Sequence, residues 1–396
     1  MHVVIVGAGQ AGYAVATTLG REGTDLRVTL VGEEPFAPYE RPPLSKELLT
    51  GVETAPRYFL PPGDYASRGV TLRLGTAATR IDLAAKRLEL ADGSSLDWDA
   101  LVLATGGRAR RVLVPGAKHV RYLRNFDDGK ALLAAMRPGL RLLCVGGGVI
   151  GLEVAASMHS AGAKVTVAEL APELLVRVMP APERQFLRNL HEAAGVSFRF
   201  GAGLISVVPQ ADGTYRAALK DGSLQEVDMV IAGVGMERNT TLAETAGIEV
   251  AGGIVVDHLG RTSVADVYAA GEVAAFPVPE SPVPVTMETW HHAINHGTAV
   301  ARTILGKGTG YRALTRWWTD QHGASIHVAG SPVDAVQCAL SGSREAGSYV
   351  ARYTDATGRV VMAVCVNRTR DLRACMREIE TGTVLIDAEP LAETAG

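Results

Sequence analysis

Residues 3–12, which read VVIVGAGQAG, decide the fold of this chain. The first four are apolar and mostly β-branched, as in a short buried strand, and Tyr13–Leu19 read as the start of a helix. Between them, Gly7 allows a tight turn, Gly9 lets a pyrophosphate approach the backbone, and Gly12 lets the helix pack closely on the strand. The N–H groups at the helix start would bind the two phosphates. The stretch therefore predicts a dinucleotide site without specifying the dinucleotide.

A second copy of this pattern begins at residue 141. Residues 141–145 (RLLCV) predict a strand, 146–151 (GGGVIG) a glycine loop, and 152–160 a helix, and the next strand ends at Glu169. Two complete units in one chain are far harder to obtain by chance than one. An acid at the position of Glu169 bonds the 2′-hydroxyl of NAD and repels the 2′-phosphate of NADP, which favours NAD.

Other residues follow predicted strands at positions where a nucleotide would lie. Glu33, with Glu34 as the alternative, comes after a strand at residues 26–31 and can accept hydrogen bonds from a ribose hydroxyl. Glu272 follows a short strand, and its carboxylate would bond a sugar alcohol or cap a helix. The remaining candidates after strands, or near Glu169, are Thr105, Gly106, Gly235, Gly271 and Arg177.

Composition limits the class of protein. The 396 residues are 47% apolar and 20% charged, which suits an α/β protein of two or three domains, and the net charge of -3 supplies no basic field for nucleic acid. No apolar run approaches the ~20 residues of a membrane span. The first strand is expected from His2, so no signal peptide is predicted. The four cysteines show neither C-x-x-C nor zinc spacing, which predicts reduced thiols, a cytoplasmic protein and no metal site.

Two further stretches remain open to more than one interpretation. In PYERPPLSK (38–46) the prolines predict an extended turn before a helix from Leu44, and Arg41 and Lys46 are by themselves two cations near a phosphate site. From Tyr311 the chain reads as a smaller α+β domain, in which the paired tryptophans 317–318 suit a core and the clustered arginines a solvated face. The histidines at 291 and 292 are interpreted as polar groups at a helix start, without a visible partner.

The predicted fold class is α/β, with two Rossmann-like dinucleotide-binding domains and a C-terminal α+β interface domain. The expected boundaries are 1–110 for the first part of an FAD-binding domain, 111–235 for an NAD(H)-binding domain, 236–310 for the second part of the FAD domain and 311–396 for the last domain.

Whole-chain motifs resemble a known family. The two glycine fingerprints resemble the two-dinucleotide-binding flavoproteins of the glutathione-reductase type. Within that superfamily PYERPPLSK, RYLRNFDD, GGGVIGLEVA, TSVADVYAAGEVA and WWTDQ resemble the FAD-dependent ferredoxin reductases of oxygenase systems. The resemblance covers essentially the whole chain, in the right order.

The resemblance implies roles for individual residues. FAD would be bound by Gly7, Gly9, Ala11, Gly12, Glu33, Arg41, Lys46, Ala78, Arg124, Glu272, Trp290 and Trp318. NAD(H) would be bound by Gly146, Gly148, Val149, Ile150, Gly151, Glu153 and Glu169. Lys46 and Glu153 would pair beside the flavin ring as the catalytic residues. The family usually has Asp where this chain has Glu272, so the carboxylate here is one methylene longer.

The implied activity is an NADH:ferredoxin or rubredoxin oxidoreductase. A hydride passes from NADH to FAD, and because no cysteine precedes Cys144 to form a thiol relay, electrons leave singly to a separate iron–sulfur protein that feeds an oxygenase or P450. An acidic ferredoxin would dock near Arg312, Arg316, Arg368, Arg370, Arg373 and Arg377. The alternatives are an NADH oxidase or quinone reductase, and a redox sensor that resembles apoptosis-inducing factor.

Overall fold

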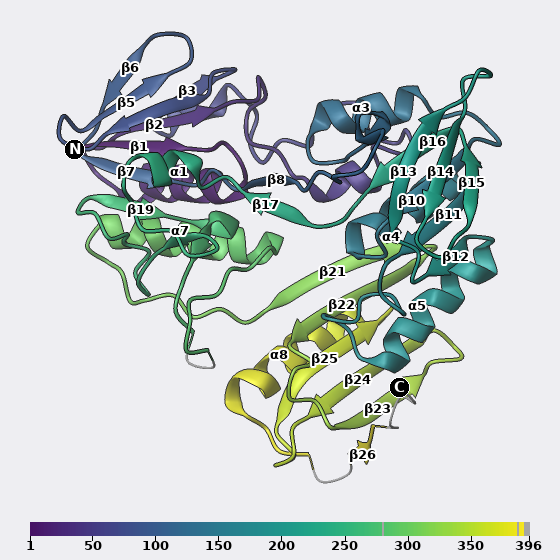
Figure 1. Cartoon of the computed structure of the whole chain (residues 1–396). Helices are drawn as coiled ribbons and strands as arrows, with labels where there is room; N and C mark the ends of the chain where they lie inside the picture. The colour runs from purple at the N-terminus through teal and green to yellow at the C-terminus, as the bar shows by residue number, and fades with distance from the viewer. Residues whose placement is uncertain (279–280, 386–387, 392–396) are drawn as a thin grey trace. The chain divides into compact units, whose positions relative to one another are not determined.

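The computed structural model describes residues 1–278, 281–385 and 388–391, and its chain forms two compact units (Figure 1). Unit 1 comprises Met1–Glu40, Ala55–Arg108 and Met236–Thr315. Unit 2 comprises Arg41–Thr54, Ala109–Gly235 and Arg316–Gly396. In the described part of the chain no helix combines the length and the apolar character needed to cross a bilayer.

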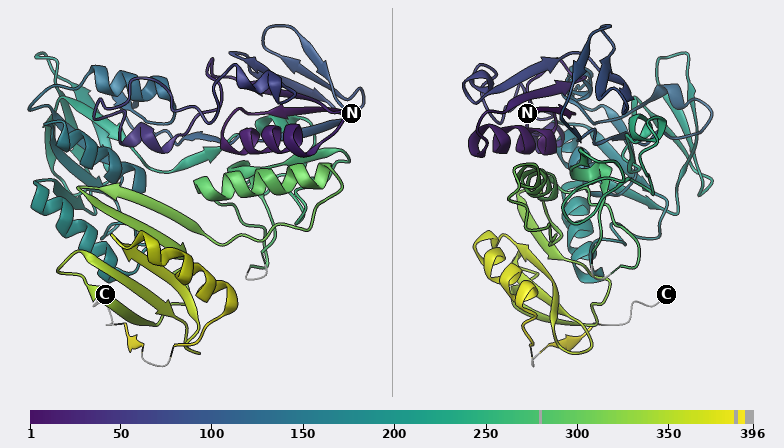
Figure 2. Two further views of the ribbon diagram at one scale, coloured as in Figure 1. Left: turned by 180° about the vertical axis from the view of Figure 1, so that it is seen from behind. Right: turned by 90° about the vertical axis from the view of Figure 1, so that its left-hand side faces the viewer.

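Unit 1 is built on a parallel sheet of strand order β19-β7-β1-β2-β3. Its strands are β1 (His2–Val6), β2 (Arg27–Gly32), β3 (Val70–Leu74), β7 (Ala100–Leu103) and β19 (Val267–Ala269). Successive residues of a strand face opposite sides of the sheet. Val3 and Ile5 accordingly pack against helices α1 (Gln10–Glu22) and α7 (Trp290–Ile304), which lie side by side in Figure 2.

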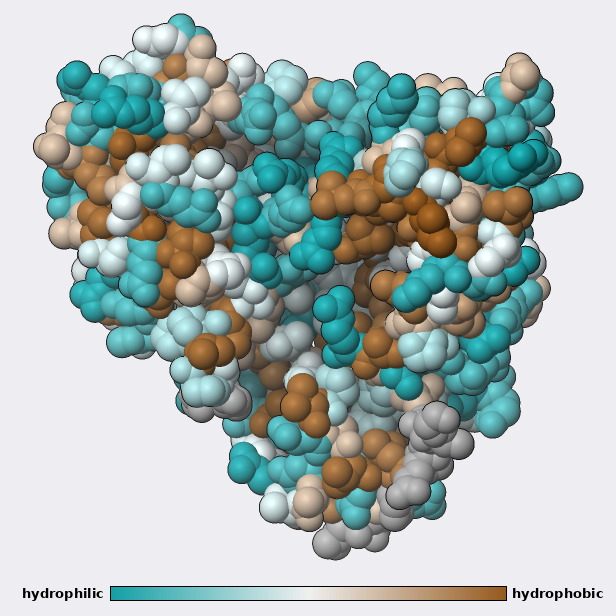
Figure 3. Space-filling view, in the orientation of Figure 1, coloured by the Kyte–Doolittle hydropathy of each residue, from teal (hydrophilic) through white to brown (hydrophobic). Residues whose placement is uncertain are grey.

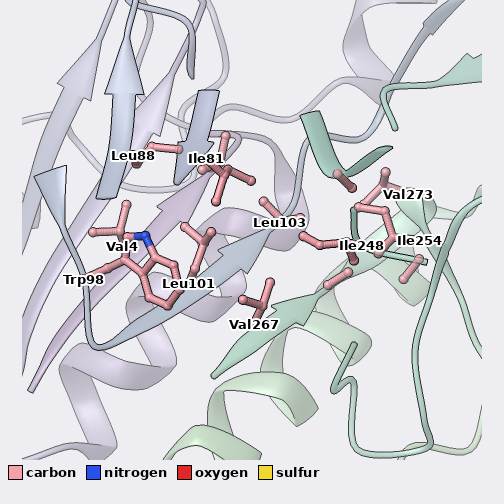
Figure 4. Close-up of a cluster of buried hydrophobic side chains, with 14 of the residues drawn as sticks. Val4, Ile81, Leu88, Trp98, Leu101, Leu103, Ile248, Ile254, Val267 and Val273 are labelled. Carbon is pink, nitrogen blue, oxygen red and sulfur yellow. The ribbon is translucent and has the colours of Figure 1, made fainter. Parts of the chain in front are cut away.

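The opposite face of this sheet is covered by antiparallel strands β4 (Ala78–Asp82), β5 (Arg87–Leu90) and β6 (Ser95–Asp97). Figure 4 shows Val4 and Leu101 of the parallel sheet in one apolar cluster with Leu88 and Trp98. The smaller elements of unit 1 are α2 (Asp64–Ser67), α6 (Thr241–Thr245), the 3-10 helix η3 (Gly271–Val273), β17 (Met236–Arg238), β18 (Ile254–Val255) and β20 (Ala274–Ala275). Strand β8 (Gly107–Ala109) lies where the chain leaves unit 1.

Unit 2 repeats this layering around a parallel sheet of order β12-β11-β10-β16-β9. One face packs on helices α3 (Phe126–Ala134) and α4 (Val149–Ser160), and the other on antiparallel strands β13 (Leu204–Pro209), β14 (Tyr215–Leu219) and β15 (Leu224–Val227). The parallel strands are β9 (Val120–Arg121), β10 (Arg141–Val145), β11 (Lys164–Glu169), β12 (Ser197–Phe200) and β16 (Met229–Ala232), and the 3-10 helix η2 (Ala117–His119) precedes β9.

The rest of unit 2 is an antiparallel sheet of order β21-β22-β25-β24-β23-β26, so that β21 and β26 form its two edges. The strands are β21 (Arg316–Gln321), β22 (Ala324–Gly330), β23 (Gln337–Ser343), β24 (Ser348–Thr354), β25 (Val360–Val366) and β26 (Glu389–Pro390). One face packs against Leu152 of α4 and Leu187 of α5 (Ala181–Ala194). The other packs against α8 (Leu372–Thr381), which follows the 3-10 helix η4 (Thr369–Asp371). The predicted α/β fold class is confirmed.

Residues 41–54 pack within unit 2, and here the predicted helix from Leu44 is wrong. The structure has only a 3-10 helix, η1 (Pro42–Ser45), which ends where Lys46 adopts φ -122° and ψ -96°. The prolines occupy the first two positions of η1, where an N–H group has no partner within a helix, so they do not by themselves exclude an α-helix. The Ser157 hydroxyl of α4 donates to the Ser45 carbonyl oxygen over 2.7 Å, which fixes this turn on α4.

A second correction concerns His292, which the sequence left without a partner. It is 2% exposed, and its Nδ1 lies 2.9 Å from the Tyr311 hydroxyl. His296, one turn along α7, is equally buried and accepts a hydrogen bond from the Gly271 N–H over 3.2 Å. Burial lowers the pKa of His292 to about 4 and that of His296 well below 6.5, because the charged imidazolium loses its hydration.

Gly7→Ala should lower the free energy of unfolding by about 2–5 kcal/mol. Gly7 has φ +111°, and a Cβ there would collide with the carbonyl oxygen of Ala104. Gly9→Ala is the matched control, because nothing lies within 4 Å of its Cβ position, and its loss should stay below about 1 kcal/mol. Urea unfolding of flavin-free protein, followed by circular dichroism, measures both. Equal losses in the two variants would contradict this account.

Unit 1 should lose stability as the pH falls from about 6.5 toward 4. Both buried histidines bind a proton more readily when unfolded, so their stabilisation is complete above the unfolded pKa and is lost as the pH approaches the folded one. Each adds about 1.4 kcal/mol per pH unit to the slope. Urea unfolding between those pH values should show a shallower slope for His292→Phe and an unchanged one for the exposed His258→Asn. Identical slopes in all three proteins would disprove the assignment.

Candidate functional site

The two glycine loops have the same geometry. In unit 1 a Cβ on Gly7 or Gly12 would collide with backbone oxygens, whereas a Cβ on Gly9 would meet open space. In unit 2 a Cβ on Gly146 or Gly151 would also collide with a backbone oxygen. A Cβ on Gly148 would have no neighbour closer than the Gly233 carbonyl oxygen, at 4.0 Å. In each loop the outer glycines serve packing. The middle one leaves room at a helix N-terminus, as a bound pyrophosphate requires.

The acids that follow the second strands differ in their surroundings. Glu169 accepts hydrogen bonds from the Gly147 N–H over 2.6 Å and from the Ala171 N–H over 2.8 Å, so it also holds the glycine loop. Glu33 is exposed just after β2, whereas Glu34 accepts a bond from the Tyr39 hydroxyl over 2.6 Å. The sequence left both acids open for the ribose, and Glu33 is the more exposed of the two.

Lys46 and Glu153, which lie 107 residues apart, meet in unit 2. The Lys46 ammonium lies 3.2 Å from Oε1 of Glu153, 3.8 Å from Oδ2 of Asp320 and 5.6 Å from the centre of the Trp318 ring. Glu153 also accepts bonds from the hydroxyl of Ser45 and, over 2.7 Å, from that of Thr319.

Burial and the bonding partners of Glu153 act in opposite directions on the pKa of its carboxyl group. Glu153 is 3% exposed, and desolvation raises its pKa, while the Lys46 ammonium and the bonds from Ser45 and Thr319 oppose that rise. The two groups thus form an ion pair in which the carboxylate is buried and the ammonium is partly exposed. A charge placed beside such a pair interacts strongly with it, and pairs of this kind are common at functional sites.

The other residues expected around the flavin lie mostly in unit 1. Thr105 donates to the Asn239 carbonyl oxygen over 2.8 Å, and the Gly106 carbonyl oxygen accepts from the Asn239 N–H over 2.9 Å. Glu272 follows Gly271 in η3, and its carbonyl oxygen accepts from Arg238 over 3.1 Å. Ala11 is buried in α1, Ala78 begins β4, and Trp290 begins α7 near the Phe59 ring.

Arg41 and Arg124 lie together in unit 2, where the Arg41 guanidinium donates to the Arg124 carbonyl oxygen over 2.6 Å. Gly235, with φ +99°, accepts a hydrogen bond from the Arg110 N–H over 3.0 Å. Both contacts shape backbone near the ends of strands of unit 2.

An apolar surface borders the second glycine loop. Ile150 follows Val149 at the start of α4 and is 48% exposed, and Leu170, directly after β11, is 60% exposed. Arg177 is exposed in the same connection, beside Val176. In Figure 3 hydrophobic residues gather over the part of unit 2 that Figure 1 labels β10, β11 and α4. Exposed apolar side chains beside a glycine loop suit the rings of a dinucleotide.

The arginines expected to dock a partner are not equivalent. Arg370, Arg373 and Arg377 are exposed on η4 and α8, and Arg368 pairs with Asp371 over 2.7 Å. Arg316 is half-buried, and its guanidinium donates to the Met376 sulfur over 3.6 Å. Arg312 is exposed in unit 1. Of these six arginines, the exposed ones of unit 2 therefore lie on η4 and α8.

Sequence reasoning missed the polar residues behind Glu153. Thr319, Gln321 and His191 are buried and hydrogen-bonded to one another in a row that ends at this carboxylate. Thr319 and Gln321 belong to the WWTDQ motif, where they occupy alternate positions of one strand and so face the same side of the sheet. His191 lies on α5, 130 residues from Gln321, and no local pattern marks it.

Comparison with known proteins agrees with this geometry. The pyridine nucleotide-disulphide oxidoreductase family matches residues 1–297, and the reductase C-terminal family matches residues 316–395. The benzene 1,2-dioxygenase system ferredoxin–NAD(+) reductase subunit of Pseudomonas putida is 35% identical over 397 residues, covering 100% of this chain and 96% of the relative. Rhodocoxin reductase of Rhodococcus erythropolis is 34% identical, with 96% and 90% covered.

Among solved structures, a chain of the covalent putidaredoxin reductase–putidaredoxin complex superposes with a TM-score of 0.90 at 33% identity, over 96% of this chain and 93% of that chain. The resemblance to oxygenase-coupled ferredoxin reductases is thereby confirmed. The chain belongs to the pyridine nucleotide-disulphide oxidoreductase family, in the branch whose members end in a reductase C-terminal domain.

Proposed function

We propose that this protein is an FAD-dependent NADH:ferredoxin reductase that supplies electrons to an oxygenase or P450 through a separate iron–sulfur protein. The observation that carries this proposal is the pair of glycine loops, one in each unit, in which only the middle glycine faces open space. The relative named as the ferredoxin–NAD(+) reductase subunit of a benzene 1,2-dioxygenase system supports the choice of acceptor.

In this proposal the loop at Gly7–Gly12 binds FAD, and the loop at Gly146–Gly151 binds NADH. FAD supplies the chemistry of accepting a hydride and releasing its electrons one at a time. The chain's own task is to hold the two nucleotides and to exclude water. Glu169, which the structure shows beside Gly147, accepts the ribose hydroxyl and disfavours a 2′-phosphate.

Lys46 is the residue that we assign to stabilising negative charge on the reduced cofactor. Its ammonium is held by Glu153 at 3.2 Å and is 14% exposed, so little water screens it. Glu153 keeps the ammonium in place. Ser45, which donates to Glu153 and is itself fixed by Ser157, sets the position of both.

The proposed electron transfer does not pass through a cysteine thiol. The four cysteines lie in unit 2, free of disulfides, and Cys144, Cys365 and Cys375 are buried inside its two sheets and α8. None belongs to the segment 41–54 that carries Lys46. The electrons therefore leave for an external acceptor. The free thiols and the use of NADH support a cytoplasmic location.

Lys46→Met should slow the reduction of the bound flavin by NADH by roughly 100-fold, because it removes the positive charge and keeps the length of the side chain. Stopped-flow absorbance under anaerobic conditions measures this rate. Lys220→Met, at an exposed position of unit 2, serves as the control and should leave the rate unchanged. A normal rate in Lys46→Met would remove the residue from the catalytic assignment.

The proposed acceptor site is the exposed arginine face of α8, Arg373 and Arg377. Reversing both charges, Arg373→Glu with Arg377→Glu, should raise the KM for an acidic ferredoxin about tenfold and weaken its salt dependence, because steering of the partner is lost. Reduction of ferricyanide should stay normal. Arg68→Glu, exposed in unit 1, is the control. If ferredoxin reduction is equally fast in all variants at low salt, this face is not the docking site.

A further inference from the structure

A row of four hydrogen bonds leads from Glu153 to His322. Thr319 Oγ1 lies 2.7 Å from Oε1 of Glu153, and Gln321 Nε2 lies 2.8 Å from Thr319 Oγ1. Gln321 Oε1 lies 2.6 Å from Nε2 of His191. Nδ1 of His191 then lies 3.1 Å from Nε2 of His322, in the turn between β21 and β22.

This row is buried along most of its length. His191 and Thr319 are fully buried and Gln321 is 2% exposed, whereas His322 is half-buried. The residues come from β21, α5 and the β21–β22 turn, and Glu153 comes from α4, so every link except Thr319–Gln321 joins separate elements. Polar groups at this depth are kept only when they are bonded.

The chemistry of the groups sets the direction of every bond. An ionised Glu153 only accepts, so Thr319 must donate its single hydroxyl hydrogen to it. The Thr319 oxygen then accepts from the Gln321 amide nitrogen, which leaves the amide oxygen facing His191. That oxygen requires a donor, so His191 carries its hydrogen on Nε2.

The far end of the row follows from the charge of His191. Burial lowers its pKa to about 4, so the ring is neutral and its Nδ1 is an acceptor. His322 therefore donates to it through Nε2. All four bonds point their hydrogens toward Glu153, and bonds aligned in one direction polarise one another.

We propose that Thr319, Gln321 and His191 are positioning residues that keep Glu153 ionised and paired with Lys46. This proposal rests on the function assigned above to Lys46 and Glu153. The charged and titratable groups that face the row are Lys46 from the turn after η1, Asp320 from β21, and, at the far end, His322 with the His159 ring 5.9 Å away. Without the row, burial would favour the neutral acid, and Lys46 would lose its counter-ion.

Thr319→Val tests the row, since it removes the hydroxyl and keeps the shape of the side chain. The carboxyl titration of Glu153, followed by carbon-13 NMR, should move upward by about one pH unit, the scale of a lost charge-assisted hydrogen bond. Thr319→Ser should restore it. His159→Gln changes a ring that lies beside His322, at the far end of the row, and should leave the Glu153 titration unchanged. An unmoved titration in Thr319→Val would overturn the proposal.

The unaltered protein provides a second test that does not depend on a variant folding. Nitrogen-15 NMR of His191 should show the hydrogen on Nε2 at neutral pH. A hydrogen on Nδ1 would reverse the row and disprove the proposed direction.

The two proposals can fail separately. In Thr319→Val the acid limb of the pH profile of flavin reduction should move upward with the Glu153 titration. If the titration moves while neither Thr319→Val nor Lys46→Met affects flavin reduction, the row stands and the catalytic role of the Lys46–Glu153 pair fails. If the titration is unmoved while Lys46→Met is slow, the catalytic role stands and the row fails.

Discussion

The buried carboxylate of Glu153 is the constraint on which the organisation of unit 2 depends. A charge in an apolar interior costs several kcal/mol unless it is bonded, and removal of one partner of such a pair costs about 3–5 kcal/mol. Its partners come from η1 and β21, which are separated from α4 by more than a hundred residues on either side. The need to satisfy this one charge therefore ties three distant segments into one unit.

The layered architecture of the two units fixes the position of each glycine loop. In each unit a parallel sheet lies between helices and a small antiparallel sheet, and alternate strand residues fill the two cores. The glycine loop sits at the carboxyl end of the first strand, where two glycines are fixed by backbone contacts. Rigid surroundings leave the middle glycine as the one open position.

Local patterns predicted the parts of the fold that local physics controls. The strand at 141–145 and both glycine loops depend on neighbouring residues, and they were found from the sequence. The segment after Pro42 was misjudged, because its shape depends on Ser157 and Glu153, far along the chain. His191 was missed for the same reason, since its partner Gln321 lies 130 residues away along the chain. Lys46 and Glu153 were found only through the family resemblance.

The bonds that Glu169 makes to the glycine loop, together with its proposed role toward the ribose, have a consequence for engineering coenzyme preference. Its carboxylate holds the N–H groups of Gly147 and Ala171, so the acid that would bond the ribose also shapes the loop beneath the pyrophosphate. Exchanging it for a small neutral residue to admit a phosphorylated coenzyme would release two loop amides at once. A redesign toward NADPH therefore has to replace the acceptor for those amides as well as add a cation. A single substitution at this position would admit the phosphorylated coenzyme but leave the glycine loop less ordered.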